Sequence, residues 1–101
     1  MSLVINIYYT GQNGNAKKFV EEMTTSGLVN LIRQEEGNEK YEYYFSKDDP
    51  ETVLLIDVWS GEDALNNHHK SDLMKKIAEL RDKYKLHMKV EQFVRKSELK
   101  N

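Results

Sequence analysis

The chain of 101 residues has no cysteine, a single proline and no apolar run long enough to cross a bilayer. Without cysteine it cannot form disulfides, thiolate metal sites or a thiol nucleophile. This fits a reducing compartment, and we expect a cytoplasmic protein. A membrane-spanning helix needs about 20 mostly apolar residues, so we expect no membrane span. The first residues lack a basic segment followed by an apolar one, and we expect no cleaved leader.

An excess of charge of one sign is also missing. The 15 Lys and Arg residues and the 17 Asp and Glu residues are interspersed, which gives a net charge of −2. Nucleic acid binding needs clustered Lys and Arg and is not expected. His68 and His69 are adjacent and diverge on most backbones, so no metal site is predicted. The Gly11-x-x-Gly14 turn is too short for a phosphate-binding loop, and we expect no cofactor.

The sequence does contain regular strand patterns. Residues 3–9 (LVINIYY) and 40–45 (KYEYYF) are rich in β-branched and aromatic residues, as is typical of strands. Residues 53–59 (VLLIDVW) are apolar except for Asp57, which predicts a strand covered on both faces. Residues 86–94 alternate and predict a half-buried strand with Leu86, Met88, Val90, Gln92 and Val94 on one face.

Helical spacing separates these strands. Apolar residues recur at helical intervals over 16–32, with a weak point at Ser26-Gly27. A short helix is predicted from Ala64 to about residue 67, so that His68 follows it, and another helix follows from residue 72 to about 84. The predicted N-caps are Asn15, Ser60 and Ser71. The order β-α-β-β-α-β predicts a ferredoxin-like α+β fold with an antiparallel sheet, formed by residues 1–101 as one domain.

Short motifs occur in a fixed order between residues 33 and 74. They are Glu36-Gly37, the aromatic run 41–44, Asp49-Pro50, Asp57-x-Trp59, Ala64-Leu65, His68 and Ser71. In this order and spacing the chain resembles the antibiotic biosynthesis monooxygenase family, and the resemblance covers nearly its whole length. The family usually has Glu where this chain has Asp57.

The resemblance implies a dimeric α+β barrel, in which two copies pack their sheets together and each holds a pocket between sheet and helices. The family includes cofactor-independent oxygenases of phenols and quinols, haem-degrading enzymes and a protein that processes a phosphorylated autoinducer. The haem-degrading members have Trp at the position of His68 and His at that of Ala78. Haem is therefore not expected in this chain.

His68 and Asp57 are the candidate catalytic residues. A histidine can exchange a proton with a phenol or enol near neutral pH. Asp57 is the only charge in its strand, so it is either an acid–base group or half of a structural pair with a cation such as Arg95. His68 could instead only order its loop, while His69 and His87 are expected to face solvent.

The candidate substrate-binding residues are Trp59, Asn6, Tyr43 and Tyr44. An indole N–H can donate to a substrate oxygen while its ring stacks on an aromatic compound. Asn6 is the one strongly polar residue of its strand and must satisfy its amide. Each of these residues has a structural alternative, because sheets are rich in tyrosine and Trp59 could be a core anchor.

We therefore expect a cofactor-independent monooxygenase that acts on a small quinol-like or polyphenolic substrate with O₂, and that works as a homodimer. Two alternatives remain open. One is a non-catalytic dimer that binds a small molecule. The other is a sugar-phosphate isomerase or processing protein like the autoinducer branch, which would need a cation such as Lys70 or Arg33 at the pocket mouth.

Overall fold

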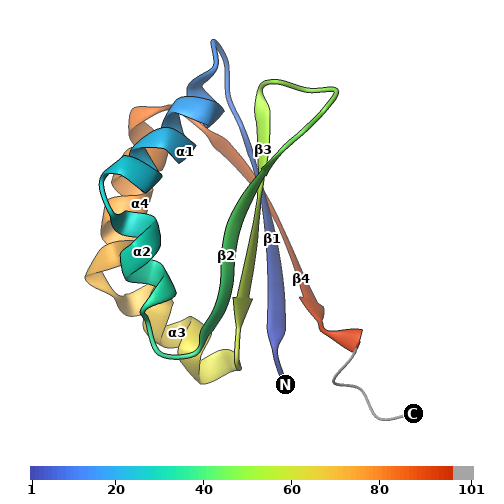
Figure 1. The fold of residues 1–101 in the computed structure, drawn as a ribbon, viewed down its shortest axis with the longest axis vertical. Helices are drawn as coiled ribbons and strands as arrows, with labels where there is room; N and C mark the ends of the chain where they lie inside the picture. Colours follow the sequence, from blue (N-terminus) through green and yellow to red (C-terminus); the bar gives the residue numbers. More distant parts are fainter. Residues whose placement is uncertain (97–101) are drawn as a thin grey trace.

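The computed structural model describes residues 1–96, which form a four-stranded antiparallel sheet with four helices on one of its faces (Figure 1). This confirms the ferredoxin-like α+β fold. Along the chain the elements are β1 (Leu3–Thr10), α1 (Asn15–Thr25), α2 (Leu28–Arg33), β2 (Asn38–Phe45), β3 (Thr52–Trp59), α3 (Glu62–Lys70), α4 (Asp72–Lys83) and β4 (His87–Val94).

The strand order is β2-β3-β1-β4, so the apolar strands β1 and β3 are central. Ile5 of β1 pairs with Asp57 of β3 on one side and with Gln92 of β4 on the other. Tyr41 of β2 pairs in turn with Asp57. Directly paired residues point to the same face of a sheet, so these four side chains form one row across the face that the helices cover.

The core lies between this face and the helix layer, because each element buries one side of its pattern. Phe19, Met23, Ile32 and Ile77 of the helices are almost fully buried against Leu55 and other strand residues. Burial of one such side chain is worth about 1.5–3 kcal/mol. β4 forms where the alternation predicted a strand, but the prediction that it is half-buried is wrong. Met88, Val90 and Val94 are 43–53% exposed because the helices leave this edge strand partly open.

Two glycines allow sharp turns at the helix ends. Gly27 (φ 85°) separates α1 from α2, which confirms the predicted weak point. Gly37 (φ 84°) lies before β2, and its Cα faces Ala64 of α3 so closely that no side chain would fit between them. Only glycine adopts this conformation without a steric cost.

The predicted helix boundaries are partly wrong. The short helix is longer than expected, so His68 and His69 lie within α3 and not after it. Gly61 and Gly14, not Ser60 and Asn15, occupy the N-cap positions, and neither helix has a side-chain cap. The Ser71 cap is confirmed, since its hydroxyl accepts from the Met74 N–H. No helix within residues 1–96 has the length and apolar character of a membrane span.

Candidate active site

A cavity of about 250 Å³ lies between the covered face of the sheet and helices α3 and α4. Its walls are largely apolar and include Ile5, Ile7, Leu55, Leu65, Met74, Ile77, Met88 and Val90. Its polar groups are Tyr9, Tyr41, Asp57, His68, His69 and Gln92. An apolar cavity with a few polar groups is the usual form of a small-molecule site.

Asp57 is placed in this cavity by the middle of β3 and is only 4% exposed. Its Oδ1 atom has no hydrogen-bond partner among the described residues. Burial raises the pKa of Asp57 to about 7, and the negative charge of Glu35 adds to the rise. The nearby Trp59 indole N–H lowers the pKa, although the two groups lie outside hydrogen-bond geometry. Arg95 lies near Glu39 (3.9 Å between Nη1 and Oε1) and forms no pair with Asp57.

His68 is buried on the inner side of α3, where three contacts orient it. Its Nδ1 atom lies 2.7 Å from Glu35 Oε1, in the turn after α2. Its ring stacks on Trp59 with 4.6 Å between centroids and 28° between planes. The Ser71 hydroxyl donates to its backbone carbonyl (2.7 Å), which fixes the end of α3. Nε2 is then the ring nitrogen left to meet a molecule in the cavity.

Trp59 is completely buried behind His68 and does not line the cavity. Its indole N–H has no acceptor within the described part of the chain. The structure thus brings Trp59, His68 and Asp57 together, with Trp59 as the support on which the imidazole ring lies.

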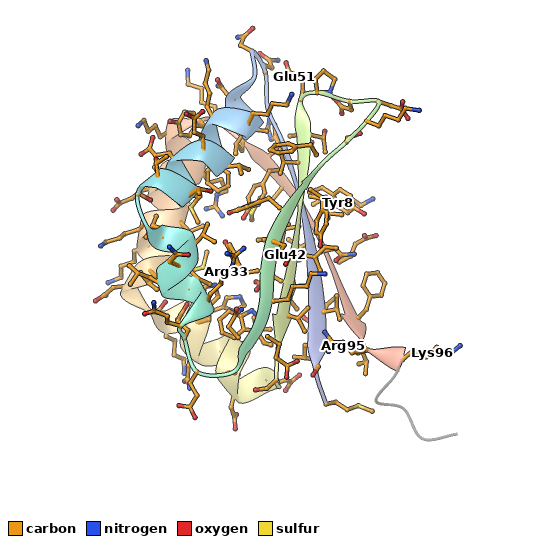
Figure 2. The ribbon with its side chains drawn as sticks, in the orientation of Figure 1. Tyr8, Arg33, Glu42, Glu51, Arg95 and Lys96 are labelled. Atoms are coloured by element: carbon orange, nitrogen blue, oxygen red, sulfur yellow. The ribbon has the colours of Figure 1, made fainter. Side chains whose placement is uncertain are left out.

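Three tyrosines form the inner end of the site. Tyr9 and Tyr41 line the cavity, while Tyr43 lies deeper, with 3.4 Å between its hydroxyl and that of Tyr41. Burial raises the pKa of all three, so their hydroxyls stay protonated. The Arg33 side chain reaches from α2 to the Tyr41 carbonyl (Figure 2), to which Nη2 donates at 2.7 Å.

Two of the predicted substrate-binding residues, Asn6 and Tyr44, lie on the other face of the sheet, away from the cavity. Asn6 of β1 pairs with Ile56 of β3, and both residues are next in sequence to the pair Ile5 and Asp57. Successive residues of a strand point to opposite faces, so Asn6 faces away from the cavity. Tyr44 pairs with Leu54, which pairs with Tyr8 (labelled in Figure 2), so the three side chains lie on the same face. The Tyr44 hydroxyl donates to Glu42 Oε2 at 2.6 Å. Neither residue can reach a ligand beside His68, because the sheet separates them.

The structure also adds residues that the sequence did not indicate. Gln92 and His69 belong to the cavity wall, and partial burial and the neighbouring His68 lower the pKa of His69. The cavity wall contains no Lys or Arg among the described residues, so Lys70 and Arg33 do not supply the cation expected for a phosphorylated substrate. No group of three His, Asp or Glu side chains with the arrangement of a metal site occurs within residues 1–96.

Comparison with known proteins finds the same fold in solved structures of low sequence identity. A conserved protein from Methanosarcina mazei is 20% identical over 95% of this chain and 94% of its own, with a TM-score of 0.82. A protein from Pseudomonas aeruginosa is 23% identical over 93% of each chain (TM-score 0.77). A mutant of SnoaB, a cofactor-independent oxygenase from Streptomyces nogalater, is 14% identical over 94% of this chain and 93% of its own (TM-score 0.78).

A search of the curated proteins finds no match. The sequence profile described as antibiotic biosynthesis monooxygenase matches residues 2–80, which includes β1 to α3 and most of α4. The match contains the residues of the cavity except those of β4. The chain therefore belongs to the antibiotic biosynthesis monooxygenase family.

Proposed function

We propose that this chain is a cofactor-independent monooxygenase of a small phenolic or quinol-like compound. The observation that carries the proposal is that His68 and Asp57 line the same apolar cavity. One of them is a histidine held by a carboxylate, and the other is a buried carboxyl group whose pKa lies near 7. General acid–base chemistry requires a proton acceptor and a proton donor that face the same substrate.

The first step is removal of the phenolic proton by His68 Nε2. The resulting anion has an electron-rich ring carbon, which forms a C–O bond with O₂. The peroxide then takes the proton from the imidazolium. Apolar walls favour this step, since they admit O₂ and exclude water that would solvate the anion.

The second step breaks the O–O bond. The ring carbon loses its hydrogen as a proton to the neutral His68 imidazole, and the outer oxygen leaves as water with a proton from Asp57. A quinol with a free ring position and O₂ thus give a hydroxyquinone and water. All the electrons come from the substrate, so no further reductant is needed.

The size of the cavity limits the substrate. Sites for drug-sized ligands have volumes of about 300–1,000 Å³. The cavity of about 250 Å³ lies just below this range and suits one or two fused rings. Tyr9, Tyr41 and Gln92 would hydrogen-bond the substrate's oxygen atoms.

We also propose a homodimer, joined through the sheet face that the helices leave open. This face carries Val4, Tyr8, Leu54 and Ile56, with Phe93 half exposed. It also contains the buried Asn6 Oδ1, for which the described residues supply no donor. A second sheet packed on this face would cover these apolar groups, and it could supply the missing donor.

The activity can be tested with 1,4-naphthohydroquinone in air, by following O₂ uptake and formation of the hydroxyquinone above the rate of spontaneous oxidation. We expect His68→Ala to lower kcat by about 10²-fold or more, the usual contribution of a general base. His87→Ala is the matched control and should retain full activity, because His87 lies at the first position of β4 and outside the cavity. Equal turnover by wild type and His68→Ala would exclude His68 as the base.

A further inference from the structure

The carboxylate that holds His68 comes from a turn far from it in sequence. Glu35 Oε1 lies 2.7 Å from His68 Nδ1, and the two side chains are 19% and 4% exposed. A contact this short between a carboxylate and a ring nitrogen is a charge-assisted hydrogen bond. An ionised carboxylate can only accept, so Nδ1 carries the proton and Nε2 of the neutral ring presents its lone pair.

We propose that Glu35 is a positioning residue for the reaction, one that holds His68 in the tautomer whose Nε2 can accept a proton from the substrate. This inference rests on the proposed role of His68 as base. Glu35 itself does not line the cavity and would touch neither substrate nor O₂. It acts through His68, as carboxylates do when they orient a catalytic imidazole.

The turn that carries Glu35 is fixed in place by the backbone. The Glu35 N–H donates to the Ile32 carbonyl (3.0 Å) and the Asn38 N–H to the Glu35 carbonyl (3.1 Å). The Ser60 N–H donates to the Gly37 carbonyl (2.8 Å), which joins the turn to the segment that leads into α3. Glu35 lies in this turn and His68 lies in α3, so these backbone hydrogen bonds set the distance between the Glu35 carboxylate and the His68 imidazole.

The neighbours of the His68 ring restrict its orientation. Trp59 covers one of its faces at 4.6 Å, and His69 lies 5.9 Å away between ring centroids. Asp57 lies on the same wall, where burial and, to a smaller extent, the negative charge of Glu35 raise its pKa to about 7. Glu35 therefore acts on both groups, by orienting the base and by favouring the neutral form of the acid.

The tautomer can be measured without any substrate, from the ring ¹⁵N and ¹H signals of His68 recorded over a series of alkaline buffers. The test variant is Glu35→Leu, which keeps the bulk and removes the acceptor. Glu36→Leu is the matched control, since Glu36 is the next residue and is exposed. Glu35→Gln serves as a second variant of the same shape, should the leucine variant fail to fold.

We expect wild type and Glu36→Leu to show the proton on Nδ1, and Glu35→Leu to show it mainly on Nε2. With the quinol, Glu35→Leu should lose at least about tenfold in kcat with KM within about twofold, because the base is disoriented and the cavity is unchanged. An unchanged tautomer in Glu35→Leu would overturn the inference, and so would a wild-type kcat in that variant. A shifted tautomer in a protein that never oxidises quinols would support the role of Glu35 and overturn the proposed function.

Discussion

Asp57 is a buried carboxyl group, and no cation among residues 1–96 forms an ion pair with it. Tyr9, Tyr41 and His68 line the same cavity, and the negative charge of Glu35 adds to the rise in pKa that burial causes. A charge in such a place costs several kcal/mol unless the group takes up a proton. Asp57 is therefore protonated in acid, whereas in alkali its buried negative charge destabilises the folded protein.

This cost predicts that stability falls as pH rises. The pKa of Asp57 is about 7 in the folded chain against an ordinary value of 3.8, so the folded state binds more protons between these values. Protonation of Asp57 in the folded state contributes fully to the free energy of unfolding below about pH 4. This contribution is lost as the pH rises through the folded pKa of about 7, and the free energy does not change further at higher pH. The loss in free energy of unfolding relative to Asp57→Asn should be about 2–4 kcal/mol.

Urea denaturation of wild type and Asp57→Asn between pH 4.5 and 8.5 measures this difference. Asp48→Asn is the control, because Asp48 is exposed in the turn between β2 and β3 and should give a curve parallel to wild type. A constant difference between wild type and Asp57→Asn over the whole pH range would show that Asp57 is not protonated by burial.

Single residues of the site could be predicted from the sequence where their chemistry is unusual for their surroundings. Asp57 is the one charge in an apolar strand, and His68 lies at a fixed distance from the Asp57-x-Trp59 motif. Asn6 looked equally unusual, but its face depends on the register of β1 with β3, which no local pattern specifies. Glu35 was missed because its partner is 33 positions away.

The helices and strands were easier to predict than their ends. Periodicity placed each element, but α3 begins at Glu62 after an uncapped Gly61 and extends to Lys70. α4 ends with Lys85 in the left-handed conformation (φ 54°), where the Lys85 and Leu86 N–H groups bond back to the last turn. Glycine is the usual residue in this motif, so the left-handed Lys85 could not be predicted, although the helical spacing did predict the end of α4 to within one residue.

Gly37 is where the turn that bears Glu35 meets α3. An added Cβ would lie against Ala64 Cβ and 2.7 Å from Ser60 Oγ, and the positive φ would be strained as well. We expect Gly37→Ala to lower the free energy of unfolding by about 3 kcal/mol or more, since strain and overpacking add. Any folded Gly37→Ala protein should also lose activity, because the turn must move away from His68.

The variant Gly14→Ala separates the strain of a positive φ from the overpacking against Ala64. Gly14 also has a positive φ (75°), but open space surrounds its Cα, so only the conformational cost of about 1–2 kcal/mol should remain. Thermal or urea unfolding of both variants provides the comparison. Equal losses for Gly37→Ala and Gly14→Ala would mean that the contact with Ala64 does not hold the turn in place.

Residues 1–96 form one helix layer, which covers one of the two faces of the sheet. The helices cover the cavity side, while the other side is partly open at Tyr8 and Ile56 of the central strands and at the half-exposed Phe93. A chain of about 100 residues buries only about two thirds of its surface, so an additional interface adds a large share of its stability. In the proposed homodimer, two copies would pack these apolar faces against each other, with the same residues on both sides of the interface.

Sedimentation velocity at micromolar concentration should therefore give twice the chain mass of 11.9 kDa. Ile56→Glu places a carboxylate in the middle of the open face and should give monomers, because burying two unpaired charges against each other is unfavourable. Leu31→Glu is the control, since Leu31 is a 45% exposed apolar residue of α2, on the helix side. The unfolding temperature of wild type should rise with protein concentration, as expected when assembly stabilises the fold, whereas that of Ile56→Glu should not. Wild-type protein that sediments as a monomer, or an Ile56→Glu variant that remains dimeric, would show that this face is not the interface.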